Sequence, residues 1–149
     1  MAFAETLVRL QLSSSLDLLE LVGIVTDSAC RMARLDDEAR HWVTMAVRES
    51  VINAVIHGNE NDVRKLVFVE FASSQPPAPP ELHIRVRDEG GGFDPAEVAD
   101  PLTPENILKS GGRGVFLIRS FMDEVVLQRA PEGGMEIRMV KRLQDEASR

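Results

Sequence analysis

The chain is organised around one segment, Glu49-Ser-Val-Ile-Asn-Ala-Val-Ile-His-Gly-Asn59. Its polar residues Glu49, Asn53 and His57 recur at every fourth position. On a helix these residues lie on one side, about 6 Å apart along the axis. The residues between them are mostly apolar, so this side borders a buried surface where a carboxylate and an amide each need a polar partner. A hard cation and an activated hydroxyl or water are suitable partners.

The composition indicates one globular domain spanning residues 1–149, with enough chain to bury a core. A net charge of −7 argues against nucleic acid or an anionic membrane as the main partner. No apolar run approaches the roughly 20 residues of a membrane span, and the N-terminus lacks the pattern of a signal peptide. The single cysteine, Cys30, excludes an internal disulfide. We therefore expect a cytoplasmic protein.

The first third of the chain predicts a strand followed by a helix. Residues 6–12 alternate apolar and polar positions, which is typical of a half-buried strand. Ser14 and Asp17 have the spacing of a capping box, and an apolar face with helical spacing then continues to about Arg34.

A second helix is predicted to contain the segment described first. Asp36 is its expected N-cap, because a short acceptor side chain there satisfies free backbone N–H groups. The helix is expected to run to His57, and Gly58 to terminate it.

The remainder predicts four strands and one short helix. The expected strands are residues 65–71, 81–87, 123–129 and 135–142, and the expected helix is 115–122. The proline-rich residues 72–80 read as a stiff surface connection, and the loosely patterned residues 94–110 as a lid. From about residue 143 a frayed tail is expected. Two helices followed mainly by adjacent strands favour an α+β fold, a two-layer sandwich with a mixed or antiparallel sheet.

The first glycine motif, Asp88-Glu-Gly90-Gly-Gly92, ends a predicted strand. A carboxylate beside glycines lets the backbone approach a flat ligand and aims one acceptor at an exocyclic amine. The alternative is an ordinary turn, because Asp-x-Gly is a common turn composition.

A second glycine motif, Gly111-Gly-Arg-Gly114, precedes the predicted short helix. Glycines that open a helix present free N–H groups and a positive dipole end, which suits phosphate. A short glycine cluster alone is a weak signal. Arg113 could pair with phosphate or with a carboxylate of a partner, or could simply be exposed.

Together these segments resemble the nucleotide-binding boxes of the gyrase–Hsp90–histidine-kinase–MutL ATPase superfamily. The boxes are Glu49-x-x-x-Asn53-Ala-x-x-His57, Asp88-x-Gly-x-Gly92 and residues 112–125, the last being the most specific. Within the superfamily they are similar to the anti-sigma-factor serine/threonine kinases, bacterial regulators of partner switching. The resemblance covers nearly the whole chain and implies the Bergerat α/β sandwich, with a mobile ATP lid at about residues 94–111.

By position, the resemblance implies that Asn53 coordinates Mg²⁺ at the ATP phosphates and that Glu49 is the base that accepts the proton of the attacking hydroxyl. Asp88 would bind the adenine amino group, with Gly90 and Gly92 letting the base lie close. The other nucleotide-binding positions implied are His57, in a supporting role only, and Gly111, Gly112, Arg113, Gly114 and Val115.

The function that the resemblance implies is ATP-dependent phosphorylation of a Ser or Thr on a small STAS-type anti-anti-sigma protein. A homodimer is also implied, and the alternating strand at residues 6–12 offers a candidate surface for it. One alternative is a module that holds ATP structurally and sequesters a sigma factor, although such a binder has no need of Glu49. Another alternative is a slow ATPase that drives a dimer clamp, as in the gyrase and MutL types, although their transducer domain is missing here. The proline-rich insertion leaves the choice of partner open.

Overall fold

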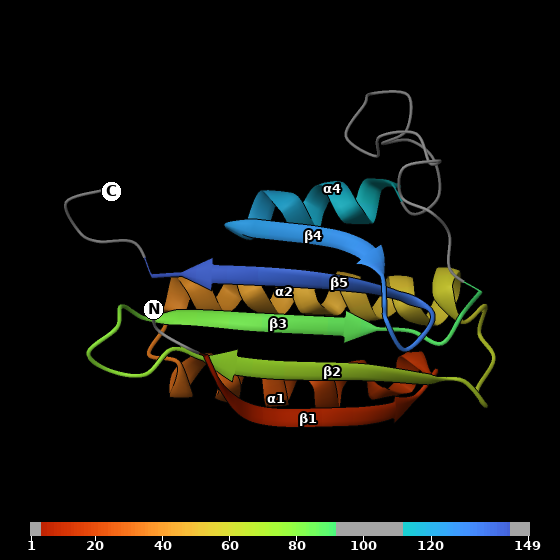
Figure 1. Ribbon diagram of the computed structural model, residues 1–149, viewed down its shortest axis with the longest axis horizontal. Coiled ribbons are helices and arrows are strands. Elements are labelled where there is room, and N and C mark those ends of the chain that lie inside the picture. The colour runs from red at the N-terminus through yellow and green to blue at the C-terminus, as the bar shows by residue number, and fades with distance from the viewer. Residues whose placement is uncertain (1–3, 92–111, 144–149) are drawn as a thin grey trace.

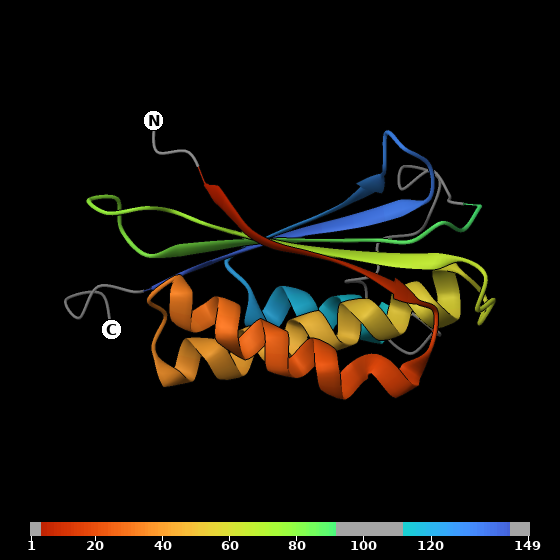
Figure 2. The ribbon, with the colours of Figure 1, turned by 90° about the horizontal axis from the view of Figure 1, so that it is seen from below.

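The computed structural model describes residues 4–91 and 112–143. In these ranges the chain forms one five-stranded sheet, in the order β1-β2-β3-β5-β4, with helices packed on one face (Figures 1 and 2). Every neighbouring pair of strands is antiparallel. The predicted α+β two-layer sandwich is therefore confirmed, with an antiparallel sheet. The expected lid at residues 94–111 and nearly all of the expected tail lie outside the described residues.

The strands lie within two residues of their predicted positions. They are β1 (Glu5–Ser13), β2 (Leu66–Ser73), β3 (Glu81–Arg87), β4 (Glu124–Arg129) and β5 (Met135–Arg142). Burial alternates along β2 and β3, as the sequence pattern predicts for strands with one covered face. In β2, Val67, Val69 and Phe71 are fully buried toward the helices.

Helix α1 (Leu19–Met32) follows a short 3₁₀ turn, Leu16–Leu18. The N-cap of this 3₁₀ turn is Ser15 rather than Ser14, because Ser15 Oγ accepts a hydrogen bond from the Asp17 N–H at 3.2 Å. Ser14 is instead buried, and its hydroxyl donates to the Lys65 carbonyl at 2.7 Å. The observed cap therefore lies one residue after the predicted Ser14, and it caps the 3₁₀ turn.

Helix α2 (Asp37–Asn53) begins as predicted, with Asp36 Oδ1 accepting from the Ala39 N–H at 2.9 Å. It ends earlier than predicted, because residues Ala54–Gly58 form a π-helix. There the Asn59 N–H donates to the Ala54 carbonyl, five residues earlier, at 2.8 Å. A π-turn contains more residues than an α-turn. The spacing of four residues that aligns Glu49 with Asn53 on α2 therefore does not align His57 with them in the same way.

Helix α4 (Gly112–Phe121) begins three residues before its predicted start. Gly112 and Gly114 consequently belong to its first turn, not to a loop that precedes it. Its other end is anchored by Phe121, whose ring stacks on Trp42 of α2 with 5.1 Å between centroids. Ile118 is fully buried beneath the sheet. Among the described ranges, no helix is long and apolar enough to cross a membrane.

The connection between β2 and β3 is folded back on itself. Ser74 Oγ donates to the Pro79 carbonyl at 2.7 Å, and the Ala78 N–H donates to the Gln75 carbonyl at 2.9 Å. Arg34, which follows α1, donates to the Ala78 carbonyl at 3.2 Å. The predicted surface connection is thus attached to the junction between the two long helices.

Replacing Gly23 by alanine is expected to raise the free energy of unfolding by about 1 kcal/mol, because glycine inside a helix is less stable than alanine. Gly23 lies within α1, and an added Cβ meets no atom within 4 Å. Urea unfolding of both proteins measures the difference. A lower free energy of unfolding in Gly23→Ala than in the wild type would show that the added methyl group is not tolerated at this position of α1.

Candidate functional site

The C-terminal end of the α2–π-helix segment and the end of β3 meet at one end of the sheet (Figure 1). Asp88, the residue after β3, is only 6% exposed there. Its Oδ1 accepts hydrogen bonds from the Gly90 N–H at 2.9 Å and from the Met135 N–H at 3.1 Å. The Asp88 N–H in turn donates to the Met135 carbonyl at 3.0 Å. Backbone contacts therefore hold this carboxylate in one orientation.

Gly58 packs directly against the Asp88 carboxylate. A Cβ at Gly58 would lie 2.0 Å from Asp88 Oδ2, and one at Gly90 would lie 1.9 Å from the Gly58 carbonyl oxygen. No side chain fits at either distance. Among described glycines, positive φ occurs only at Gly133 and Gly134. Gly58 is consequently needed for this close contact. The helical segment does end at Gly58, as predicted, but without the positive φ of a left-handed cap.

Asn53 faces the first turn of α4. A Cβ at Gly114 would lie 2.9 Å from Asn53 Nδ2, so the side-chain amide and the start of this helix are in contact. The first N–H groups of a helix have no partner within it, and they attract anions. Glu49 lies one turn before Asn53 on α2, and both are half-buried. The motif that contains Glu49 and Asn53 therefore meets the second glycine motif here. The two motifs bring a carboxylate, an amide and free N–H groups to one location.

Comparison with known proteins assigns the chain to a family. Residues 12–141 match the family described as histidine kinase-like ATPase domain. The chain belongs to this family. It is 36% identical over 103 residues to the anti-sigma F factor of Oceanobacillus iheyensis, covering 68% of each protein. It is 34% identical over 117 residues to the anti-sigma F factor of Bacillus subtilis, covering 75% of this chain and 77% of that protein. The predicted relationship to anti-sigma factors is confirmed.

A solved structure supports the fold. The RsbU and RsbW domains of Rv1364c from Mycobacterium tuberculosis superpose with a TM-score of 0.64 at 18% sequence identity. The match covers 91% of this chain and 31% of that longer one. The described sheet and helices therefore share their fold with part of that structure.

Other predicted site residues fall outside these contacts. His57 is exposed within the π-helix, and its neighbour Gly58 makes the contact with Asp88. Arg113 and Val115 lie in the first turn of α4, where Val115 is half-buried. Gly92 and Gly111 lie outside the described residues.

Asn59 is a residue of the site that the sequence interpretation missed. It is fully buried, and its Nδ2 donates to Ser14 Oγ at 2.7 Å and to the Leu66 carbonyl at 3.0 Å. Its Oδ1 accepts from the Glu89 N–H at 2.8 Å. Asn59 therefore ties the end of the π-helix to β2 and to the turn that holds Asp88. The only available signal was its position directly after Gly58.

The donor types at this ATPase-family site suit a nucleotide bound with a hard cation. Within residues 4–91 and 112–143, no group of three or more His, Cys, Asp or Glu side chains could hold a metal ion. The Asn53 amide oxygen beside the helix start is a ligand type that Mg²⁺ accepts, because Mg²⁺ commonly takes one or two protein oxygens together with substrate phosphates. The residues of this site therefore fit a nucleotide bound together with Mg²⁺.

Proposed function

We propose that this protein is an ATP-binding anti-sigma-factor-type kinase. It transfers the γ-phosphate of ATP to a Ser or Thr hydroxyl of a STAS-type anti-anti-sigma protein in a partner-switching pathway. The observation that carries the proposal is the contact between Asn53 and the first turn of α4, at the same end of the sheet as the buried Asp88. This arrangement provides separate positions for the base and the phosphates of one nucleotide.

Asp88 is the adenine-recognising residue in this proposal. Backbone N–H groups occupy its Oδ1, so Oδ2 is the oxygen suited to accept from the exocyclic amine. Gly90, together with Gly92, lets the base approach the backbone. A carboxylate built to accept from one amine discriminates against ligands that lack it, since its buried acceptor then stays unpaired.

The phosphates would lie at the start of α4. The N–H groups of its first turn, at Gly112, Gly114 and Val115, are oriented to bind anions there. Gly111 and Arg113 would complete the phosphate contacts, and Asn53 would coordinate Mg²⁺, with His57 in a supporting role. When bound, this ion neutralises charge that develops on the transferred phosphoryl group. Glu49 then accepts the proton of the attacking hydroxyl.

The relatives named anti-sigma F factor support the proposed partners. We propose that the chain binds a sigma factor and an anti-anti-sigma protein, acts in the cytoplasm as one domain of residues 1–149, and forms a homodimer. The edge strand β1 offers a surface for the second copy, because its outward positions are exposed.

The test is transfer of labelled γ-phosphate from Mg·ATP to each STAS-type protein of the same genome. Label on a Ser or Thr of one candidate would support the kinase and identify its substrate. ATP binding without label on any candidate would favour the alternative, a non-catalytic module that sequesters a sigma factor.

Asp88→Asn is expected to weaken ATP binding at least tenfold, because an amide nitrogen would then face the exocyclic amine of adenine. The side chain keeps its shape, so folding should be retained. Calorimetric titration with ATP measures the change, and Asp62→Asn, a surface carboxylate paired with Arg64, is the control. An unchanged Kd for Asp88→Asn would contradict the adenine assignment.

A further inference from the structure

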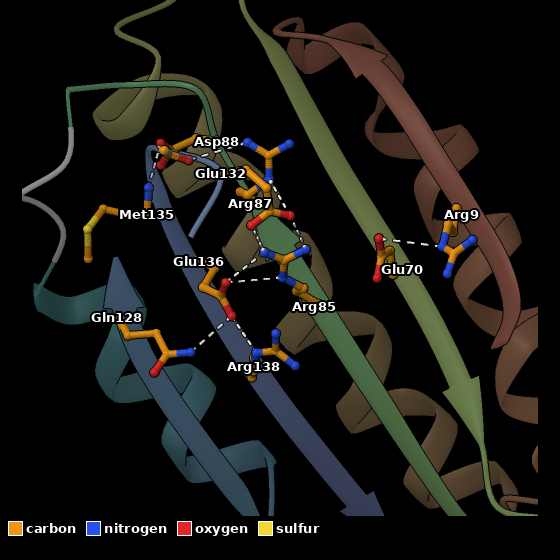
Figure 3. Close-up of polar contacts among 11 residues, drawn as sticks. Arg9, Glu70, Arg85, Arg87, Asp88, Gln128, Glu132, Met135, Glu136 and Arg138 are labelled. Carbon is orange, nitrogen blue, oxygen red and sulfur yellow. Dashed lines mark hydrogen bonds and ion pairs between the residues drawn. The ribbon is translucent and has the colours of Figure 1, made fainter. Parts of the chain in front are cut away.

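The face of the sheet opposite the helices has a cluster of ion pairs at the end of β3 (Figure 3). Arg85 forms two parallel hydrogen bonds with Glu132, with Nη1 to Oε2 at 3.0 Å and Nη2 to Oε1 at 2.7 Å. The Arg85 side chain is only 14% exposed. This fork geometry constrains both side chains more than a single contact would. It joins β3 to the turn between β4 and β5.

Arg87 makes a second connection between the same two segments. Its Nη1 donates to the Gly133 carbonyl at 3.3 Å, and its Nε lies 3.8 Å from Glu132 Oε2. Its guanidinium lies 4.0 Å from the centroid of the Phe68 ring, so its own position is set by packing. Two arginines of β3 therefore hold the turn from one side.

Glu136 strengthens the connection from β5. It is 1% exposed and accepts from Arg85 Nη2 at 2.7 Å, from Gln128 Nε2 at 3.1 Å and from Arg138. Burial alone would raise the pKa of Glu136, but these hydrogen bonds outweigh it and the pKa lies below its usual value. Hydrogen bonds from Arg85 likewise lower the pKa of Glu132 to about 2. Both carboxylates are therefore charged at neutral pH.

The held turn leads directly to a contact with Asp88. Gly134 follows Glu132 and Gly133, and a Cβ at Gly134 would lie 2.1 Å from the Asp88 carbonyl oxygen. The next residue, Met135, donates its N–H to Asp88 Oδ1 at 3.1 Å. Successive residues of a strand point to opposite faces. Arg87 thus faces the open side, while Asp88 points toward Gly58 on the helix side.

We propose that Glu132, held by Arg85 and Arg87, is a positioning residue for adenine recognition. From the far face of the sheet, it holds the turn between β4 and β5 so that the Met135 N–H orients the Asp88 carboxylate toward the exocyclic amine. The inference rests on the proposed ATP-binding function. It assigns part of the selectivity for adenine to residues that do not touch the nucleotide.

Hydrogen exchange of the nucleotide-free chain tests the first half of this proposal. In Glu132→Ala, the Met135 amide is expected to exchange about fivefold faster than in the wild type, the scale of a partly exposed ion pair. The matched control is Glu70→Ala, which removes an ion pair with Arg9 (3.6 Å) on the same face but away from the turn. Unchanged exchange at Met135 would overturn the proposal. If the alanine variant does not fold, Glu132→Gln replaces it.

Nucleotide selectivity tests the second half. Kd is measured for ATP and for purine riboside triphosphate, which lacks the exocyclic amine. The preference for ATP is the ratio of the two Kd values. In Glu132→Ala this ratio should move about threefold closer to one, whereas Glu70→Ala should keep the wild-type ratio. Simple loss of stability would lower the melting temperature without changing this ratio. Equal weakening of both nucleotides would overturn the positioning role. A wild type that shows no preference would refute the adenine assignment itself, whatever the variants do.

Discussion

Replacing Glu49 by alanine is expected to reduce phosphate transfer at least about a hundredfold and to leave ATP affinity within about twofold, because a positioned base contributes to the chemical step. Glu49 is half-buried one turn before Asn53, whose amide contacts the start of α4. It therefore lies one helical turn from the residue that contacts the start of α4, where the phosphates are proposed to bind. Single-turnover transfer to the STAS-type substrate and equilibrium binding of ATP measure the two quantities separately.

Glu38 provides the control for this experiment. It lies in the first turn of the same helix, is exposed, and is about three turns from Glu49. Glu38→Ala should transfer phosphate at the wild-type rate. Glu49→Gln keeps the shape of the side chain and removes the base, so it should be as inactive as Glu49→Ala. Retained transfer in both Glu49 variants would show that another group accepts the proton.

Gly58→Ala is expected to weaken ATP binding at least about tenfold, because strong overpacking displaces the groups around it. The new Cβ would lie 2.0 Å from Asp88 Oδ2 and 2.4 Å from Cγ of the same carboxylate. Two backbone N–H groups hold the other oxygen, so the carboxylate cannot move away and keep both bonds. Calorimetric titration with ATP measures the loss.

Gly91→Ala is the matched control for Gly58→Ala. It alters the glycine-rich turn after β3, but a Cβ there meets no atom within 4 Å. Its ATP affinity should stay within about twofold of the wild type. Circular dichroism establishes that both variants fold. Wild-type affinity in folded Gly58→Ala would mean that Asp88 recognises the ligand without the close contact.

Short-range patterns in the sequence determined the secondary structure to a large extent. The predicted limits of β3 and β5 coincide with Glu81–Arg87 and Met135–Arg142, because alternation along one strand reflects one covered face of a sheet. Asp36 caps α2 as expected, since a cap depends on residues within one turn. The motifs also predicted that Glu49, Asn53, Asp88 and Gly114 belong to one site. The structure brings Asn53 into contact with the start of α4 at Gly114, and the chemical roles of all four residues stay predictions.

The tertiary structure alone decided how the site is built. Gly58 reads in sequence as a helix terminator, yet it is required because Asp88, thirty residues later, packs against it. The partners of Asn59 come from the residue after β1, from β2 and from the turn after β3. The partners of Arg85 come from the turn between β4 and β5 and from β5 itself. Local periodicity reports whether a residue faces the core or solvent. Which distant residue it meets depends on how the strands and helices pack, so these contacts become visible only in the folded chain.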